Sequence, residues 1–189
     1  MESNTTTISP NGASGDVDLI DVPGYGARGR SEWMDIDWRQ HRRVTSIAGR
    51  DVNFVEMGDP EAPPLVMIHG LAGCWQNWLE NIPVMARDFR VIAPDLPGFG
   101  LSELPAESIS LPGYARTIAG LLDVLEIDRA HLIGNSMGGQ TAVQTSIDFP
   151  DRTARMILVS PAGLATSSTP KSLGALAGAV TFAIGKLAG

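Results

Sequence analysis

The chain has 189 residues, 43% of them hydrophobic, which is enough for one domain with a sizeable buried core. A net charge of −7 argues against nucleic acid as a partner. The single cysteine excludes a disulfide framework and suits a reducing compartment, so a cytoplasmic location is expected. No segment has the length and apolar character of a membrane span, and no transmembrane segment is expected. Nothing in the sequence indicates an oligomeric state.

Residues 1–38 are predicted to form an acidic, flexible leader. They hold seven acidic residues against two arginines, together with scattered Gly, Pro and Ser. Such a composition buries little apolar surface and contains no signal-peptide apolar region. The core of the domain is therefore expected over residues 39–168.

Strands and helices are predicted to alternate along this core. The predicted strands cover residues 43–48, 51–57, 65–68, 90–93, 131–133 and 155–160. The predicted helices cover residues 78–86, 111–125 and 136–149. This order predicts the α/β class, with an open and mostly parallel sheet, helices on both of its faces, and a chain that ends after about the sixth strand.

The most informative motif is Gly134-x-Ser136-x-Gly138, at the junction of a predicted strand and a predicted helix. Glycines on both sides of a serine let the two backbones approach without Cβ collisions. The hydroxyl then lies at a helix N-terminus, where free N–H groups favour developing negative charge. Ser136 is the candidate nucleophile, and the alternative is a glycine-rich turn with an incidental serine.

Two further motifs follow the buried strands at 65–68 and 90–93. The first is His69-Gly70-Leu71-Ala72-Gly73, whose glycines let a backbone N–H turn toward a nucleophile. The second is Asp95-x-Pro97-Gly98-x-Gly100-x-Ser102, in which proline and glycine favour a tight, rigid loop.

With these motifs in this order, residues 42–165 resemble the N-terminal part of an α/β-hydrolase-fold serine hydrolase of the esterase or lipase kind. The resemblance implies that Ser136 is the nucleophile and that the N–H groups of Leu71 and Met137 bind the oxyanion. Residues with a supporting role in the family match His69, Gly70, Gly134 and Gly138. Epoxide hydrolases and haloalkane dehalogenases carry aspartate where this chain has serine.

The resemblance also implies a substrate class. A small-molecule carboxylic ester or a related acyl compound is expected, and carbon–carbon bond hydrolases, cofactor-free haloperoxidases and acyltransferases share the same motifs. No cofactor and no metal are implied.

The chain departs from the family pattern in its catalytic acid and base. Family members place an acidic residue and then a histidine after the serine, and no histidine follows Ser136 here. Asp148 and Asp151 are expected at the far end of a helix, about 20 Å from the serine. The sequence therefore predicts an incomplete or inactive fragment of a hydrolase. Two alternatives are a non-catalytic small-molecule or partner-binding protein of the same fold, and one half of a split enzyme.

Several other residues have more than one interpretation. His69 borders the elbow and is either structural or a substitute base, whereas His131 and His41 are expected to be packed and solvated, respectively. Cys74 is expected to be a small buried residue or a pocket-lining thiol. Residues 169–189, which include a run of 14 uncharged residues between two lysines, are expected to begin a helical cap, and the alternative is a Gly/Ala tail.

Overall fold

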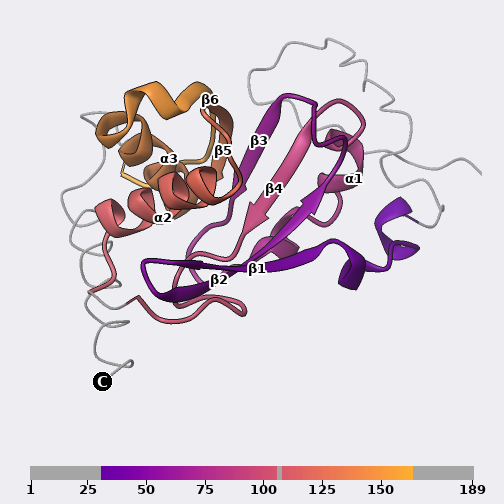
Figure 1. The fold of residues 1–189 in the computed structure, drawn as a ribbon, viewed down its shortest axis with the longest axis horizontal. Helices are drawn as coiled ribbons and strands as arrows, with labels where there is room; N and C mark the ends of the chain where they lie inside the picture. The colour runs from indigo at the N-terminus through magenta and orange to yellow at the C-terminus, as the bar shows by residue number, and fades with distance from the viewer. Residues whose placement is uncertain (1–30, 106–107, 164–189) are drawn as a thin grey trace, which may run out of the picture. The chain divides into compact units, whose positions relative to one another are not determined.

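The computed structural model describes residues 31–105 and 108–163, which fold into a six-stranded sheet with helices on both faces (Figure 1). The predicted cap over 169–189 and most of the predicted leader, residues 1–30, lie outside the described residues. No helix in the described ranges is long and apolar enough to cross a membrane.

The elements lie close to their predicted positions. The strands are β1 (Arg42–Ile47), β2 (Arg50–Met57), β3 (Pro64–Ile68), β4 (Arg90–Pro94), β5 (Ala130–Asn135) and β6 (Thr153–Val159). The α-helices are α1 (Ile82–Met85), α2 (Leu111–Val124) and α3 (Met137–Asp148). Short 3-10 helices are η1 (Glu32–Met34), η2 (Trp38–Gln40), η3 (Trp75–Trp78) and η4 (Pro150–Arg152).

The strand order across the sheet is β1-β2-β4-β3-β5-β6. The β1–β2 and β2–β4 pairs are antiparallel, and the pairs from β4 through β3 and β5 to β6 are parallel. The expected α/β class with a mostly parallel sheet is confirmed. Because β3, β4 and β5 are parallel, the loops that follow them leave the same edge of the sheet, where all three sequence motifs lie.

The core has two layers, one on each face of the sheet. Along β3, Val66 and Ile68 join the cluster beneath α2 and α3, whereas Leu65 and Met67 join the cluster beneath η3 and α1. Successive side chains of a strand point to opposite faces, so a central strand covered on both sides must be apolar throughout. This double burial explains the continuous apolar runs that predicted β3 and β4.

The helix predicted over residues 78–86 is wrong in its length. The structure has η3 (Trp75–Trp78), a break, and then the four-residue helix α1, with Pro83 in its first turn. Proline lacks an N–H and its ring collides with the preceding turn of a helix, so an α-helix can begin at Pro83 but cannot run through it.

Residues 31–38, which the sequence assigned to the flexible leader, contact the core. The indole Nε1 of Trp38 donates to the carbonyl of Trp33 at 3.0 Å, and the Trp38 ring lies 5.1 Å from that of Trp75. Glu32 forms an ion pair with Arg87 at 2.8 Å. The packed part of the chain therefore begins before residue 39.

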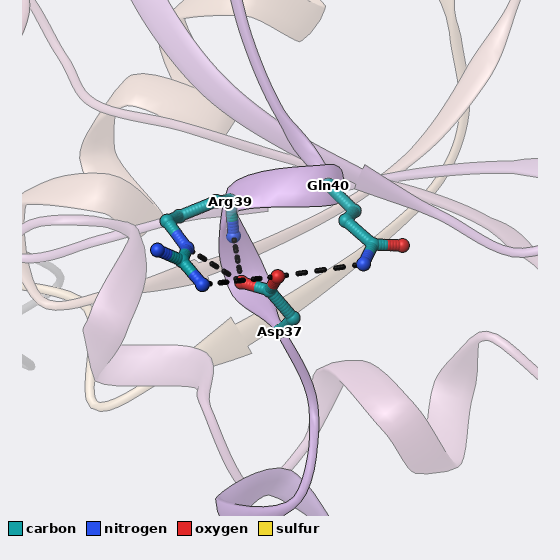
Figure 2. Close-up of polar contacts among 3 residues, drawn as sticks. All are labelled: Asp37, Arg39 and Gln40. Carbon is teal, nitrogen blue, oxygen red and sulfur yellow. Dashed lines mark hydrogen bonds and ion pairs between the residues drawn. The ribbon is translucent and has the colours of Figure 1, made fainter.

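The Asp37 carboxylate shapes the entry into β1 by capping η2 (Figure 2). It accepts hydrogen bonds from the backbone N–H and the guanidinium of Arg39 and from the side-chain amide of Gln40. The hydrogen bond from the Arg39 side chain lowers the pKa of the Asp37 carboxyl. Because the cap is exposed, it sets the direction of the chain and contributes little to stability.

The outer edge of β6 pairs with no other strand among the described residues, and Ile157 on this strand is 58% exposed. Exposed apolar edge strands recruit other chains.

We expect the 189-residue chain, expressed alone, to self-associate, and Ile157→Lys to reduce the associated fraction because a charge at an edge opposes strand pairing. Light scattering after size-exclusion chromatography measures the effect. The control is Ile147→Lys on α3, where the side chain is 66% exposed away from the edge. A monodisperse monomer of the unsubstituted chain would contradict the prediction.

Candidate active site

Ser136 lies at a sharp turn between β5 and α3, with φ +53° and ψ −114°. This region is sparsely populated by non-glycine residues, so the backbone is strained and its surroundings must hold it in place. The Ser136 N–H donates to the carbonyl of Val159 at 2.9 Å, and its carbonyl accepts from the N–H of Gly139 at 3.0 Å and of Ala162 at 3.2 Å. Hydrogen bonds to β6 and to the first turn of α3 therefore fix the conformation of the serine.

The glycines that flank Ser136 lie in direct contact with neighbouring backbone. A Cβ placed on Gly134 would lie 2.2 Å from the carbonyl oxygen of Gly138, and a Cβ on Gly138 would lie 2.2 Å from that of Ile68. Neither position can hold a larger residue without moving main chain. These contacts seat the N-terminus of α3 on β3 and β5.

The loop after β3 lies beside the elbow. A Cβ on Gly70 would be 3.4 Å from the Cβ of Ser136, and the turn is closed by the Gly73 N–H, which donates to the Gly70 carbonyl at 3.1 Å. Within the described ranges, the N–H groups of Leu71 and Met137 donate no hydrogen bond to the protein. Among the described residues, the two N–H groups that the family resemblance assigns to the oxyanion therefore have no acceptor.

The fully buried ring of His69 uses both of its nitrogens. Nε2 lies 2.9 Å from the backbone N of Leu96 and Nδ1 lies 2.7 Å from the carbonyl oxygen of Gly70. Because an N–H can only donate and a carbonyl can only accept, Nε2 is unprotonated and Nδ1 carries the proton. Neither nitrogen is available to remove a proton from Ser136, so the geometry argues against His69 as a substitute base.

Burial lowers the pKa of His69 below its ordinary 6.5, against smaller opposing effects of the Gly70 hydrogen bond and the Asp95 charge. The His69 imidazole is therefore protonated more readily in the unfolded chain than in the folded one. The stability that His69 contributes is complete above its unfolded pKa of 6.5. It is lost as the pH falls toward the lower pKa that His69 has in the folded protein.

We expect the free energy of unfolding to decrease between pH 7 and pH 5, with His69 contributing up to about 1.4 kcal/mol per pH unit. His69→Asn is expected to show a shallower pH dependence, because its side chain does not titrate. His41 and His131 are present in both proteins and cancel in the comparison. Urea unfolding at the two pH values measures the difference, and equal pH slopes would contradict the assignment.

Asp95, a buried carboxylate at the end of β4, is a structural centre that sequence reasoning missed. Its Oδ1 accepts from the backbone N–H of Trp75 at 2.8 Å. Its Oδ2 accepts from the side-chain amide of Asn53 at 2.8 Å and from the backbone N–H of Leu101 at 2.9 Å. The sequence motif predicts only that Asp95 belongs to a rigid loop. Together with the hydrogen bond between Leu96 and His69, these contacts join the loop after β4 to the loop after β3 at two points.

The remaining candidates do not complete a catalytic triad. Asp148 and Asp151 are exposed at the C-terminal end of α3 and beyond it, and the ring of His131 packs edge-on against Phe89 at 6.0 Å. Cys74 is half-buried. The described residues also contain no group of three or more His, Cys, Asp or Glu side chains placed to hold a metal ion.

A family model described as the alpha/beta hydrolase fold matches residues 63–182. The 2-hydroxy-6-oxo-6-phenylhexa-2,4-dienoate hydrolase of Comamonas testosteroni is 43% identical over 122 residues, which cover 61% of this chain and 42% of that protein. The acetyltransferase component of the acetoin cleaving system of Pseudomonas putida is 41% identical over 118 residues, which cover 62% of this chain and 32% of that protein.

Among solved structures, the 2-hydroxy-6-oxo-6-phenylhexa-2,4-dienoate hydrolase of Rhodococcus sp. strain RHA1 superposes with a TM-score of 0.63 at 30% identity. The superposition covers 71% of this chain and 51% of that one. The strand order, the strained elbow serine and the family match over more than half of the sequence agree, and the chain belongs to the alpha/beta hydrolase fold family. It spans 32% and 42% of the length of the two curated relatives named above.

Proposed function

We propose that this chain carries the nucleophile and oxyanion hole of a serine hydrolase that acts on a small-molecule carboxylic ester or a related acyl compound in the cytoplasm. The observation that carries the proposal is a strained serine at a helix N-terminus, together with two backbone N–H groups that find no acceptor in the described part of the chain. Such strain persists only where the surrounding structure holds it, and it gathers at functional sites.

In the proposed reaction, Oγ of Ser136 attacks the acyl carbonyl and the carbonyl oxygen becomes an oxyanion. The N–H groups of Leu71 and Met137 bind this oxyanion, each contributing about 3–4 kcal/mol to the transition state. The serine proton passes to a histidine held by a carboxylate, and the histidine returns it to the alcohol that leaves as the ester C–O bond breaks. Water then hydrolyses the acyl-serine and restores the free hydroxyl. Because no histidine follows Ser136 in this sequence, we propose that the histidine and the carboxylate lie further along the same polypeptide.

A second substrate class is favoured by the relatives. Two of the relatives named above are hydrolases of a 2-hydroxy-6-oxo-6-phenylhexa-2,4-dienoate, which is a conjugated ketone rather than an ester. The same serine and oxyanion donors can act on a ketone carbonyl, where the bond that breaks is the carbon–carbon bond between the carbonyl and the dienoate, which leaves as a stabilised carbanion and is then protonated. Hydrolysis of p-nitrophenyl acetate and loss of the conjugated dienoate absorbance, measured on one preparation, distinguish the two classes by their kcat/KM values.

The serine assignment is tested with a fluorophosphonate probe on two proteins. One is the 189-residue chain, and the other extends through the coding sequence that follows Gly189 in frame. We expect the extended protein to be labelled at ordinary rates on the peptide that contains Ser136, as identified by mass spectrometry. The short chain is expected to label and to hydrolyse activated esters poorly, because no base activates the serine.

Two control variants sharpen this experiment. Ser146→Ala changes another serine of α3 and is expected to leave labelling intact, whereas Leu71→Pro deletes one oxyanion donor and is expected to slow it severely. Esterase turnover by the short chain at ordinary rates would contradict the requirement for an external base. If the extended protein folds and Ser136 stays unlabelled, the hydrolase proposal fails and the binding-protein alternative replaces it.

A further inference from the structure

The Gly70–Leu71 peptide lies between the buried His69 ring and the exposed surface of the loop after β3. The carbonyl of Gly70 and the N–H of Leu71 belong to the same planar, trans peptide and therefore point in opposite directions. The carbonyl oxygen accepts two hydrogen bonds, from Nδ1 of His69 at 2.7 Å and from the N–H of Gly73 at 3.1 Å. These two donors fix the peptide plane, so the Leu71 N–H is directed away from the imidazole.

The His69 ring is itself held by two further contacts. Its Nε2 accepts the N–H of Leu96 at 2.9 Å, and its ring meets Phe99 edge-on with centroids 5.5 Å apart. Complete burial removes the ring from competing water. The loop after β4 therefore helps to hold the ring that donates to the Gly70 carbonyl, and His69 connects the two loops.

We infer that His69 is the positioning residue for the oxyanion donor Leu71, acting through the Gly70 carbonyl as a neutral imidazole with its proton on Nδ1. This inference rests on the proposed function, because a directed Leu71 N–H matters to the reaction only where Ser136 is the nucleophile. The role needs the donor at the Nδ1 position, whereas the acceptor at the Nε2 position only holds the ring, and the two hydrogen bonds can be separated by substitution.

Two variants of His69 separate the donor to Gly70 from the acceptor for Leu96. In His69→Asn the side-chain NH₂ lies near the position of Nδ1 and can still donate to Gly70, but the acceptor for Leu96 is lost. In His69→Gln the amide oxygen can reach the position of Nε2 and accept from Leu96, but the donor to Gly70 is lost. Each variant removes one neutral hydrogen bond, so the two form a matched pair.

The labelling rates of the two variants are compared in the extended protein. We expect His69→Gln to lower the rate of fluorophosphonate labelling at Ser136 by about 10²–10³-fold, the effect of losing one oxyanion donor. His69→Asn is expected to stay within about tenfold of the parent, the effect of one lost neutral hydrogen bond. The loss should appear in the maximal rate constant of inactivation and not in the probe concentration at which inactivation proceeds at half that rate. Equal losses in the two variants would indicate a merely structural histidine and would overturn the inference.

A second measurement does not depend on labelling. Long-range ¹H–¹⁵N correlation spectra of the parent protein report which His69 nitrogen carries the proton, and the Nδ1–H tautomer is expected at pH 7. An Nε2–H tautomer would overturn the inference even if His69→Gln fails to fold. If the parent shows the Nδ1–H tautomer while Ser136 stays unlabelled, the proposed function fails and the connection between the loops stands.

Discussion

Replacing Ser136 with glycine is expected to abolish fluorophosphonate labelling and to make the protein more stable. The serine backbone has φ +53° and ψ −114°, a conformation open to glycine and strained for any residue with a Cβ. Relief of this strain stabilises the fold by about 1–3 kcal/mol. The greater freedom of glycine in the unfolded chain offsets about 0.4–1 kcal/mol of that gain. Urea unfolding, followed together with labelling in the extended protein, measures both effects.

Two further serine substitutions test the reason given. Ser136→Ala also removes the hydroxyl but keeps the Cβ, so labelling is lost while stability stays within about 0.5 kcal/mol of the parent. Turnover by the extended protein is expected to fall by about 10⁴–10⁶-fold in either Ser136 variant. Ser146→Gly, in the last turn of α3, is expected to destabilise by about 0.5–1 kcal/mol, because no strain is relieved there. A Ser136→Gly protein less stable than the parent would show that the elbow stores no strain.

The second large effect is expected from Gly138→Ala. Helix propensity favours alanine over glycine by about 1 kcal/mol. The new Cβ, however, would lie 2.2 Å from the Ile68 carbonyl oxygen and 2.5 Å from that of His69, both main-chain atoms at the end of β3. The start of α3 must move away from the sheet, and overpacking of this kind costs about 1–3 kcal/mol or more. We expect a net loss of stability and, because the Met137 N–H moves with the helix, slow labelling of Ser136.

Gly113→Ala in the first turn of α2 is the matched control for this substitution. Its Cβ would meet only side-chain atoms, the nearest being the Ser110 hydroxyl oxygen at 3.1 Å, and no main chain. The helix propensity gain is therefore expected to survive, and stability should change by less than about 1 kcal/mol. Denaturation midpoints of both variants measure the contrast. A Gly138→Ala protein as stable as Gly113→Ala would show that α3 does not need its close seat on β3.

The sequence predicted the sheet well because the apolar character of its strands has a direct physical cause. The runs at β3 and β4 are buried on both faces, and a continuous apolar run of that length is typical of a strand between two covering layers. The elbow was equally visible, since glycines on both sides of a serine mark a close backbone approach. The apolar residues over 78–86 favour a longer helix than the chain forms, because Pro83 limits where an α-helix can begin.

The site was only partly predictable, because its geometry depends on contacts between distant residues. The proton position on His69 follows from Leu96, 27 residues away, and one partner of Asp95 is Asn53, 42 residues away. No local pattern reports such pairs. The packing of residues 31–38 had a signal in Trp33 and Trp38, large apolar side chains in an otherwise polar and acidic stretch, and the acidity of the segment obscured it.

The tryptophans of this chain give it an optical property that follows from their placement. All four, at positions 33, 38, 75 and 78, lie on η1, η2 and η3, and the ring of Trp75 contacts that of Trp38. The N–H of Trp75 is held by the carboxylate of Asp95 directly after the loop that carries Leu71. Two of the four fluorescent tryptophans therefore lie on η3, the element that follows this loop, and a shift in their emission reports a rearrangement there without any added label.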